Sequence, residues 1–359
     1  MSCLGVDKRL AAFSVRIGFL VAAWLVALVL VGTAYEFPMA ADWSGSVPSD
    51  SIQVEKAPRK TEMVRLGYSG PSMGNIPLLM ANKRGFLADE GFQIQFIQAR
   101  SNVSIAAVVT GDMQFTSATV SSASAAGRGV PIKVVAVIVN RPYQYFIVKP
   151  GINSVNELRG KIFAVDSLGA STTYLLAKEM MRQAGLDPDK DVKIITVGDA
   201  FARIAQMKAG TIDGTSMTPP QLIVARNQGF RILGSIKNVP ELPSTGLATS
   251  EKLLKENPEQ VRRMLRATVK GLAFVRDNRE ETIRLVMDHL KLDRAIAEES
   301  YELVRDAYSP DGSMSDQGFQ LVSELQRDTG LKSNPASHMS DFSLLRQVQK
   351  QLKFEGILK

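Results

Sequence analysis

Hydroxyl side chains gather at four places where a predicted strand ends, and these side chains could bind a small polar ligand. The four segments are residues 69–72, 116–122, 167–173 and 215–218. Ligands of open α/β sheets bind outside the carboxyl ends of the strands, where hydroxyl groups and the free N–H groups of a following helix converge. The candidate ligand contacts in these segments are Ser69, Ser72, Ser117, Thr119, Ser121, Gly169, Ser171, Thr172 and Thr218.

Each candidate also has a purely structural interpretation. Ser and Thr are favoured at helix N-caps, so Ser171 and Thr172 could simply cap the helix predicted to follow them. Tyr143 is a further candidate because its ring could stack on a ligand, and Arg100 or Arg141 could pair with an acidic group. A tyrosine within a sheet and arginines in solvent fit the sequence equally well. Both interpretations stay open at this point.

A weak internal repeat contains two of the four segments. Gly111 is followed five positions later by Thr116-Ser117-Ala118-Thr119, and Gly210 is followed five positions later by Thr215-Ser216-Met217-Thr218. Each copy continues through a helix-like stretch to another glycine and an apolar strand. A repeat at this spacing predicts two lobes of one topology, each presenting a hydroxyl-rich strand end to a ligand held between them.

The sequence holds no recognisable catalytic or metal-binding motif. Cys3 is the only cysteine, and the two histidines, His289 and His338, lie in charged, helix-like sequence. Without a nucleophile–base pair, a Walker loop or a Cys/His cluster, we expect no enzyme activity, no metal and no cofactor. The net charge is +7, but basic residues are interspersed with acidic ones, so we expect no nucleic-acid binding.

The first 41 residues have the composition of an export signal. Lys8, Arg9 and Arg16 precede an uninterrupted apolar run at residues 17–31, and small residues follow it. This order is typical of a cleaved secretory signal peptide, while the length of the run also fits an uncleaved membrane anchor. Residues 42–61 are rich in Ser, Pro and charge, and they predict a flexible leader.

Strands and helices alternate through most of the remaining chain, which predicts an α/β fold with mostly parallel sheets. We expect lobe I at residues 62–148 and 246–359 and lobe II at residues 149–245, with hinges at the two crossings, 148–151 and 240–246. From residue 250 onward the pattern is helical, and the helix that begins at Pro258 carries an apolar stripe. These C-terminal helices are expected to pack on lobe I.

The segments around the strand ends resemble the sulfonate-, nitrate- and thiamine-precursor-type substrate-binding proteins. The resemblance covers residues 63–280 and rests on Gly67-Tyr68-Ser69, Ile76-Pro77-Leu78, Ala81-Asn82-Lys83-Arg84-Gly85-Phe86-Leu87, Glu90-Gly91, Val109-Thr110-Gly111-Asp112, Glu157-Leu158-Arg159-Gly160-Lys161 and Gly169-Ala170-Ser171-Thr172. Together these motifs indicate the family but specify no ligand. The resemblance implies a type 2 periplasmic-binding-protein fold with two Rossmann-like lobes, a hinge and C-terminal helices.

The function that this resemblance implies is that of a periplasmic or extracytoplasmic solute receptor of an ABC importer. Such a monomer captures a small anionic or polar organic ligand, of the sulfonate, nitrate, aromatic or pyrimidine type, and its closed form is recognised by a membrane permease. The alternative is a membrane-anchored, ligand-sensing module of the same fold. Relatives that make the thiamine pyrimidine use a cysteine-rich motif, and this chain has no cysteine after Cys3.

Overall fold

The structure is a computed structural model that describes residues 61–169, 171–236, 239, 241–327 and 335–358. The predicted signal segment at residues 1–41 and the predicted leader up to residue 60 lie outside the described residues. All described residues belong to one compact unit, residues 56–359. Among them, no helix combines the length and the apolar character that crossing a bilayer requires.

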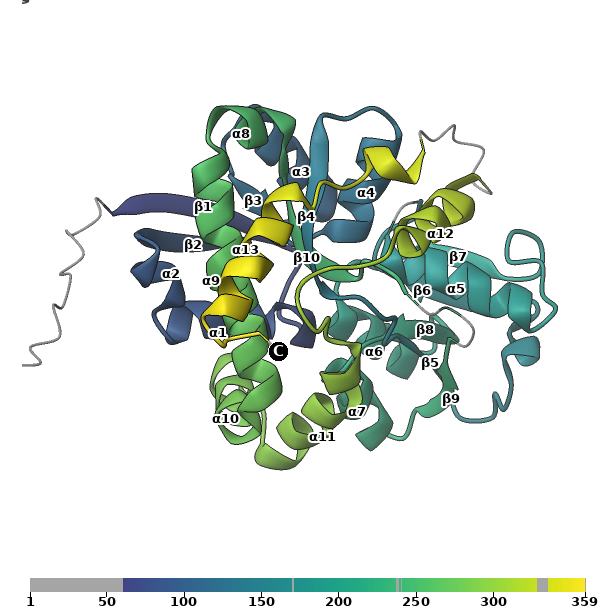
Figure 1. Cartoon of the computed structure of the whole chain (residues 1–359). Helices are drawn as coiled ribbons and strands as arrows, with labels where there is room; N and C mark the ends of the chain where they lie inside the picture. The colour runs from purple at the N-terminus through teal and green to yellow at the C-terminus, as the bar shows by residue number, and fades with distance from the viewer. Residues whose placement is uncertain (1–60, 170, 237–238, 240, 328–334, 359) are drawn as a thin grey trace, which may run out of the picture. The chain divides into compact units, whose positions relative to one another are not determined.

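The first sheet combines four strands from early in the chain with one that returns from much later (Figure 1). Its strands are β1 (Glu62–Tyr68), β2 (Phe92–Gln98), β3 (Phe115–Thr116), β4 (Ile132–Val139) and β10 (Thr245–Ser250). Their order across the sheet is β2-β1-β3-β10-β4, and β10 runs antiparallel to both of its neighbours. Since β1, β2 and β3 pair in parallel, their carboxyl ends lie at one edge.

The second sheet repeats this arrangement. Its strands are β5 (Tyr145–Val148), β6 (Ile162–Val165), β7 (Lys193–Thr196), β8 (Gly214–Met217) and β9 (Arg231–Ser235). Their order is β7-β6-β8-β5-β9, and β5 is the antiparallel strand. Position by position this is the order of the first sheet, so the internal repeat correctly predicts two units of one topology. We call the first sheet with its covering helices lobe I, and the second sheet with its helices lobe II.

The repeated hydroxyl residues occupy the third strand of each lobe. Thr116 on β3 is in register with Gly67 of the first strand, and Thr215 on β8 is in register with Ala164 of its counterpart. Both threonines are fully buried. Thr116 Oγ1 lies 3.0 Å from Ser104 Oγ, and Thr215 Oγ1 donates to the Ala164 carbonyl across 2.8 Å. These two hydroxyls therefore bind the third strand to its own lobe.

The chain passes from the first sheet to the second earlier than the sequence predicts. Residues 145–148, expected in lobe I, form β5 and pair with β8 and β9. The crossing is therefore residues 140–144, and residues 241–244 of the return crossing lie beside it, because the Leu242 N–H donates to the Asn140 carbonyl at 2.8 Å. Proline and glycine at 150–151 suggested the crossing, but they form a turn after β5.

Strand β10 is a second difference, since the sequence predicts no strand at residues 245–250. These residues are mostly small and lack the alternation of a half-exposed strand, yet all six are buried between β3 and β4. A Cβ on Gly246 would lie 2.1 Å from the Ala136 carbonyl oxygen, so only glycine permits this close approach of two backbones.

Helices follow the parallel strands and cover the sheets. In lobe I these are α1 (Ile76–Lys83), α2 (Phe86–Asp89), α3 (Ser101–Thr110) and α4 (Thr119–Gly127), with the 3-10 helix η1 (Met73–Asn75) before α1. In lobe II they are the 3-10 helix η2 (Val155–Leu158), α5 (Thr172–Gln183), α6 (Ala200–Ala209) and α7 (Gln221–Asn227).

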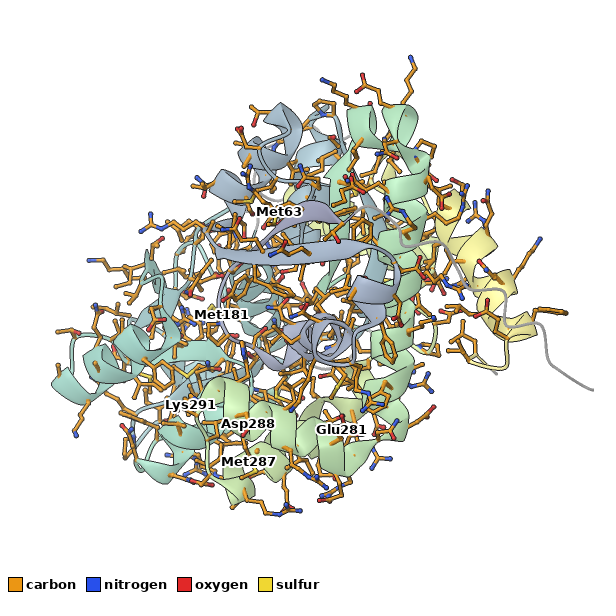
Figure 2. All side chains as sticks on the ribbon, turned by 90° about the vertical axis from the view of Figure 1, so that its left-hand side faces the viewer. Met63, Met181, Glu281, Met287, Asp288 and Lys291 are labelled. Atoms are coloured by element: carbon orange, nitrogen blue, oxygen red, sulfur yellow. The ribbon has the colours of Figure 1, made fainter. Side chains whose placement is uncertain are left out.

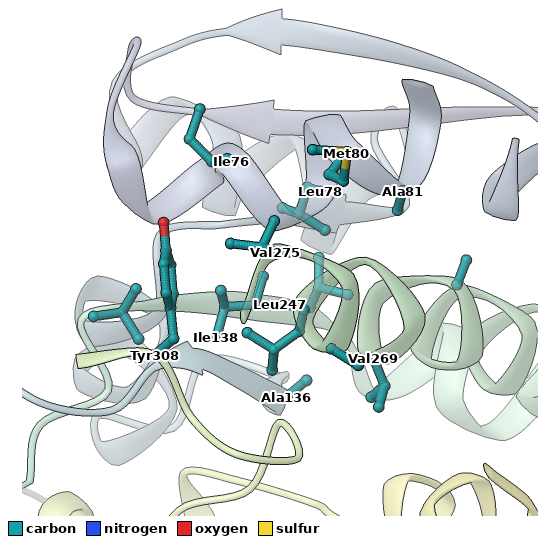
Figure 3. Packing of buried hydrophobic residues seen from close by; sticks show 14 of the residues in the cluster. Ile76, Leu78, Met80, Ala81, Ala136, Ile138, Leu247, Val269, Val275 and Tyr308 are labelled. Atoms are coloured by element: carbon teal, nitrogen blue, oxygen red, sulfur yellow. The ribbon is translucent and has the colours of Figure 1, made fainter. Parts of the chain in front are cut away.

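The remaining elements after β10 are helices, as the sequence predicts. Its elements are α8 (Glu251–Glu256), α9 (Pro258–Asp277), α10 (Arg279–Leu290), α11 (Arg294–Val304), η3 (Arg305–Ala307), α12 (Asp316–Arg327), η4 (Ala336–His338) and α13 (Ser343–Phe354). The predicted stripe of α9 is fully buried at Val261, Leu265, Val269, Leu272 and Val275. Figure 3 shows Val269 and Val275 of this stripe among buried side chains of α1, β4 and β10 in the core of lobe I.

The C-terminal helices are not confined to lobe I, where the sequence places them. Helix α12 contacts both α4 of lobe I and α5 of lobe II, and α11 contacts α7 of lobe II (Figure 1). Leu303 of α11 packs against the apolar cluster of lobe II. The C-terminal block therefore links the two lobes.

The outer face of α10 carries charged side chains that pair with the end of α1 (Figure 2). Arg84 and Glu281 lie 3.3 Å apart, and Lys83 and Asp288 lie 3.7 Å apart. Exposed pairs such as these contribute about 0–1 kcal/mol each. They are an example of the mixed, solvated surface that the interspersed charges of the sequence predict.

Candidate functional site

The predicted ligand contacts follow the carboxyl ends of parallel strands in both lobes. In lobe I, residues 69–75 follow β1 and residues 117–121 follow β3. In lobe II, residues 166–172 follow β6 and residues 218–221 follow β8. Since the parallel strands of one sheet end at one edge, the two segments of each lobe lie along that edge.

The two lobes touch beside these segments. Gln221, the first residue of α7 in lobe II, donates from Nε2 to the carbonyl oxygen of Pro71 in lobe I across 3.4 Å. A second contact joins α7 to α11, where Arg226 Nη2 donates to Glu299 Oε2 across 2.7 Å and Nη1 binds the other carboxylate oxygen. Segments 69–72 and 218–221 therefore meet at one lobe–lobe contact.

Asp166 organises the loop between β6 and α5. Its Oδ1 accepts hydrogen bonds from Ser171 Oγ at 2.7 Å and from Thr173 Oγ1. Ser171 also caps α5, because its Oγ accepts from the Tyr174 N–H at 3.2 Å. Gly169, at a φ of +90°, permits the tight turn that precedes the cap. The Ser171 hydroxyl is thus engaged within its own lobe, which favours its structural interpretation.

Arg203 is a residue of this edge that the sequence did not reveal. It is 5% exposed, and its Nη1 donates to the carbonyls of Val197 at 2.8 Å and Gly198 at 2.9 Å. Burial lowers the pKa of the guanidinium, and the carboxylates of Asp166 and Asp199 oppose that change. Its Nε has no hydrogen-bond partner among the described residues.

A signal for Arg203 does exist in the sequence. Arg203 lies next to Ile204 and four positions before Met207, and both apolar residues are buried. A charged residue on the apolar face of a helix needs internal partners. The position of Arg203 in the helical repeat of α6 therefore indicates a structural or functional role.

Three predicted contacts of lobe I have hydrogen-bond partners within the described chain. Ser69 Oγ lies 3.3 Å from Ser101 Oγ, and Ser72 Oγ accepts from Asn75 Nδ2 at 3.1 Å. Thr119 Oγ1 donates to the Pro243 carbonyl across 2.5 Å, and the side chain is fully buried. Thr119 therefore anchors the return crossing.

Tyr143 is buried at the first crossing, only 6% exposed. Burial raises the pKa of its hydroxyl to about 12, and hydrogen bonds from Thr245, the backbone of Gly74 and Ser72 oppose the rise. A ring enclosed in this way is not available for stacking on a ligand in this conformation. The environment favours the interpretation of Tyr143 as part of the sheet connection.

Four predicted contacts keep hydroxyls that make no hydrogen bond to another described residue. Ser121, Thr172 and Thr218 are partly exposed, and Ser117 is 5% exposed. Two of them belong to lobe I and two to lobe II. They are the hydroxyls best able to exchange hydrogen bonds with a ligand, and this role stays a prediction.

The charges differ between the two edges. Arg100 and Arg141, whose place was open from the sequence, are exposed and form no ion pair with a described residue. The lobe I segments contain no acidic residue, whereas lobe II has Asp166 after β6 and Asp199 after β7, both near Arg203. Within the described residues, no three His, Cys, Asp or Glu side chains form a group that could hold a metal ion.

Comparisons with known proteins agree with this architecture. Residues 73–282, more than half of the chain, match the family described as NMT1/THI5 like. The riboflavin-binding protein RibY of Chloroflexus aurantiacus is 27% identical over 228 residues, which cover 61% of this chain and 64% of RibY. The match therefore spans just under two thirds of that relative.

Solved structures of solute-binding proteins share the fold. The periplasmic aliphatic sulphonate binding protein SsuA of Escherichia coli superposes with a TM-score of 0.64 and 20% identity, covering 79% of this chain and 93% of SsuA. The periplasmic nitrate-binding protein NrtA of Synechocystis gives 0.69 and 15%, covering 84% and 92%. Such identities show a shared fold alone. With the periplasmic-binding-protein fold and the match over residues 73–282, the chain belongs to the NMT1/THI5-like family.

Proposed function

We propose that the protein is the extracytoplasmic solute-binding component of an ABC importer and holds a small polar organic ligand between its lobes. The observation that carries the proposal is the contact between Gln221 and Pro71, which joins the carboxyl-end segments of the two sheets. Open α/β sheets bind ligands at that edge, and two such edges can enclose a molecule between them.

The hydroxyls without partners supply the polar contacts in this proposal. Ser117 and Ser121 act from lobe I, and Thr172 and Thr218 act from lobe II. Each hydroxyl can donate and accept, so the four suit a ligand with several carbonyl, amide or hydroxyl groups. A ligand that bridges the lobes binds the closed form better than the open one and so shifts the population toward it.

The two crossings are the natural hinge. Residues 140–144 lie beside residues 241–244 of the return crossing, and the hydrogen bond from the Leu242 N–H to the Asn140 carbonyl links them. Closure about this pair needs backbone rotation at few positions, as in other two-lobed binding proteins. A membrane permease that reads the closed form would be the partner of the monomer, and export through the N-terminal segment would place it outside the cytoplasm.

Ligand charge is the point on which the relatives differ. RibY is a riboflavin-binding protein, whereas the sulphonate- and nitrate-binding structures take anions. In this chain two carboxylates, Asp166 and Asp199, lie at the lobe II edge beside a single buried arginine, Arg203, so this group carries a net negative charge that disfavours an anion. We therefore propose an uncharged or weakly charged polar organic ligand, with flavins and pyrimidines ahead of inorganic anions.

A thermal-shift screen followed by calorimetry tests the proposal. The panel contains riboflavin, pyrimidines, alkanesulfonates, nitrate and bicarbonate, and a ligand at a hundredfold excess over its Kd stabilises the folded state by about 2.7 kcal/mol. For the ligand that binds, Thr172→Ala with Thr218→Val should lower affinity at least tenfold. Ser343→Ala, an exposed hydroxyl far from the strand ends in sequence, is the control and should leave affinity unchanged.

Two results would contradict the proposal. A folded protein that binds no member of the panel would remove the solute-receptor role for these ligand classes. Chemical conversion of a bound ligand, detected by chromatography, would instead indicate an enzyme.

A further inference from the structure

Large apolar side chains stand exposed at the strand ends of both lobes. Among the described residues, five large apolar side chains are at least half exposed: Met63, Val103, Leu168, Phe201 and Phe354. Three of them, Val103, Leu168 and Phe201, lie in segments that directly follow the parallel strands β2, β6 and β7. Scattered exposed apolar residues are ordinary, but these three share the edge at which the sheets bind ligands.

The two lobes place these side chains in equivalent elements. Helix α3 follows β2, the second strand of lobe I, and α6 follows β7, the second strand of lobe II. Val103 lies in the first turn of α3, and Phe201 lies in the first turn of α6. Each lobe therefore presents an apolar side chain from the same place in the shared topology.

The lobe II loops that carry Leu168 and Phe201 are held by internal polar contacts. Leu168 lies between Asp166 and Ser171, whose side chains hydrogen-bond to each other at 2.7 Å. The Phe201 N–H donates to Asp199 Oδ1 at 2.9 Å, and Arg203 binds the carbonyls that precede this turn. The polar groups are thus used inside the lobe, while Leu168 and Phe201 are each 52% exposed.

An apolar surface on a fixed framework suits an apolar partner. Leaving such side chains in water costs free energy, and covering them recovers it in proportion to the area buried. Because the loops are already held in place, a ligand that covers them loses little further conformational entropy. A small inorganic anion has no apolar surface with which to do so.

We propose that Leu168, Phe201 and Val103 form an apolar rim that covers an aromatic or alkyl portion of the ligand when the lobes close. The inference rests on the proposed function and narrows its ligand class. The ligand has a polar group that the hydroxyls bind and an apolar portion beyond it, and the apolar portion sets much of the affinity. Nitrate and bicarbonate are thereby excluded as the cognate ligand.

The experiment compares rim variants with matched exposed apolar residues elsewhere. Phe201→Ala, Leu168→Ala and the double variant are titrated by calorimetry with riboflavin, hexane-1-sulfonate, methanesulfonate and nitrate. The controls are Phe354→Ala, at 93% exposure, and Met63→Ala, at 50% exposure near the amino end of β1 (Figure 2). Circular dichroism and melting temperature verify that every variant folds.

We expect riboflavin, which carries no net charge, to bind the unaltered protein most tightly, and hexane-1-sulfonate to bind it more tightly than methanesulfonate or nitrate. Phe201→Ala should weaken that binding roughly fivefold to twentyfold, and the double variant should weaken it further, while both controls keep the original Kd. The loss of affinity in the rim variants should be smaller for methanesulfonate, which lacks the apolar portion.

The outcomes separate the two proposals. Tight binding of riboflavin or hexane-1-sulfonate with an unchanged Kd in the rim variants would overturn the apolar rim and leave the solute receptor standing. Tighter binding of nitrate than of the organic probes would also overturn the apolar rim and leave the solute receptor standing. If the unaltered, folded protein binds none of the four probes and no other member of the screening panel, the proposed function and the rim fail together.

Discussion

The strand ends of lobe I and lobe II share one topology and differ in chemistry. In lobe II, α5 and α6 are capped by the side chains of Ser171 and Asp199, whereas in lobe I the residues before α3 and α4, Arg100 and Ala118, provide no side-chain cap. Lobe II encloses a buried arginine among carboxylates, and the corresponding segments of lobe I hold no acidic residue.

The shared backbone arrangement gives both lobes strand ends at equivalent positions. The side chains at those positions determine which polar, charged and apolar groups each lobe exposes. Lobe II uses its charged groups internally and so presents hydroxyl and apolar groups. Lobe I uses neutral groups, among them Thr119 and Tyr143, to hold the crossings. The following predictions test whether the charged framework belongs to lobe II alone.

The largest effect is expected for Arg203→Met. The change removes two charge-assisted hydrogen bonds to the Val197 and Gly198 carbonyls and leaves Asp166 and Asp199 without their buried cation. We expect the free energy of unfolding to fall by about 2–4 kcal/mol, because the loss leaves buried groups uncompensated. Urea denaturation measures it.

The matched change in lobe I is Arg100→Met. Arg100 is exposed and makes no ion pair with a described residue, so the free energy of unfolding should change by less than about 0.5 kcal/mol. Equal losses for Arg203→Met and Arg100→Met would show that the charged framework is not a special feature of lobe II.

Tyr143 makes the neutral framework of lobe I sensitive to alkaline pH. Its pKa is about 12 in the folded protein and about 10 when unfolded, so between these values the unfolded state binds fewer protons and stability falls as pH rises. Stability that is full below pH 10 should drop by about 2–3 kcal/mol by pH 12. Tyr143→Phe should flatten that part of the pH profile, and ultraviolet absorption of tyrosinate follows the ionisation. A profile that stays equally steep in the variant would assign the loss to other groups, such as Tyr308, whose pKa burial also raises.

The repeat and the alternation of elements could be predicted from the sequence because both depend on local pattern. The predicted alternation of strands and helices is present in both lobes, and the predicted apolar stripe of α9 is buried. Strand β10 could not be found, since its small residues gain their strand character from burial between β3 and β4. The first crossing was misplaced because a proline–glycine pair marks a turn but does not tell which sheet continues beyond it.

The position of the hydroxyl segments could be predicted from the sequence, whereas the hydrogen bonding of each side chain could not, and their role as a ligand site stays a prediction. The four hydroxyl segments do follow strand ends, as the sequence indicates. Whether a hydroxyl is free depends on partners distant in sequence, such as Pro243 for Thr119, 124 positions away. The hydrogen-bond partners of Arg203 are backbone carbonyls, which residue types do not reveal, so its place among the buried apolar residues of α6 is the signal that the sequence offers.

A smaller loss of stability than that of Arg203→Met is expected for Ser171→Ala, which tests the cap that lobe II has and α3 and α4 of lobe I lack. The Ser171 hydroxyl accepts from the Tyr174 N–H and donates to Asp166, so its loss should lower the free energy of unfolding by about 0.5–2 kcal/mol. Thr172→Ala next to it removes a hydroxyl without a described partner and should lower ligand affinity with little change in stability. Calorimetric titration and thermal melting of both variants separate the two roles. If Ser171→Ala instead weakened binding without lowering the melting temperature, the Ser171 hydroxyl would be a ligand contact. The cap of α5 would then not stabilise lobe II, and the proposed difference in capping between the lobes would be wrong.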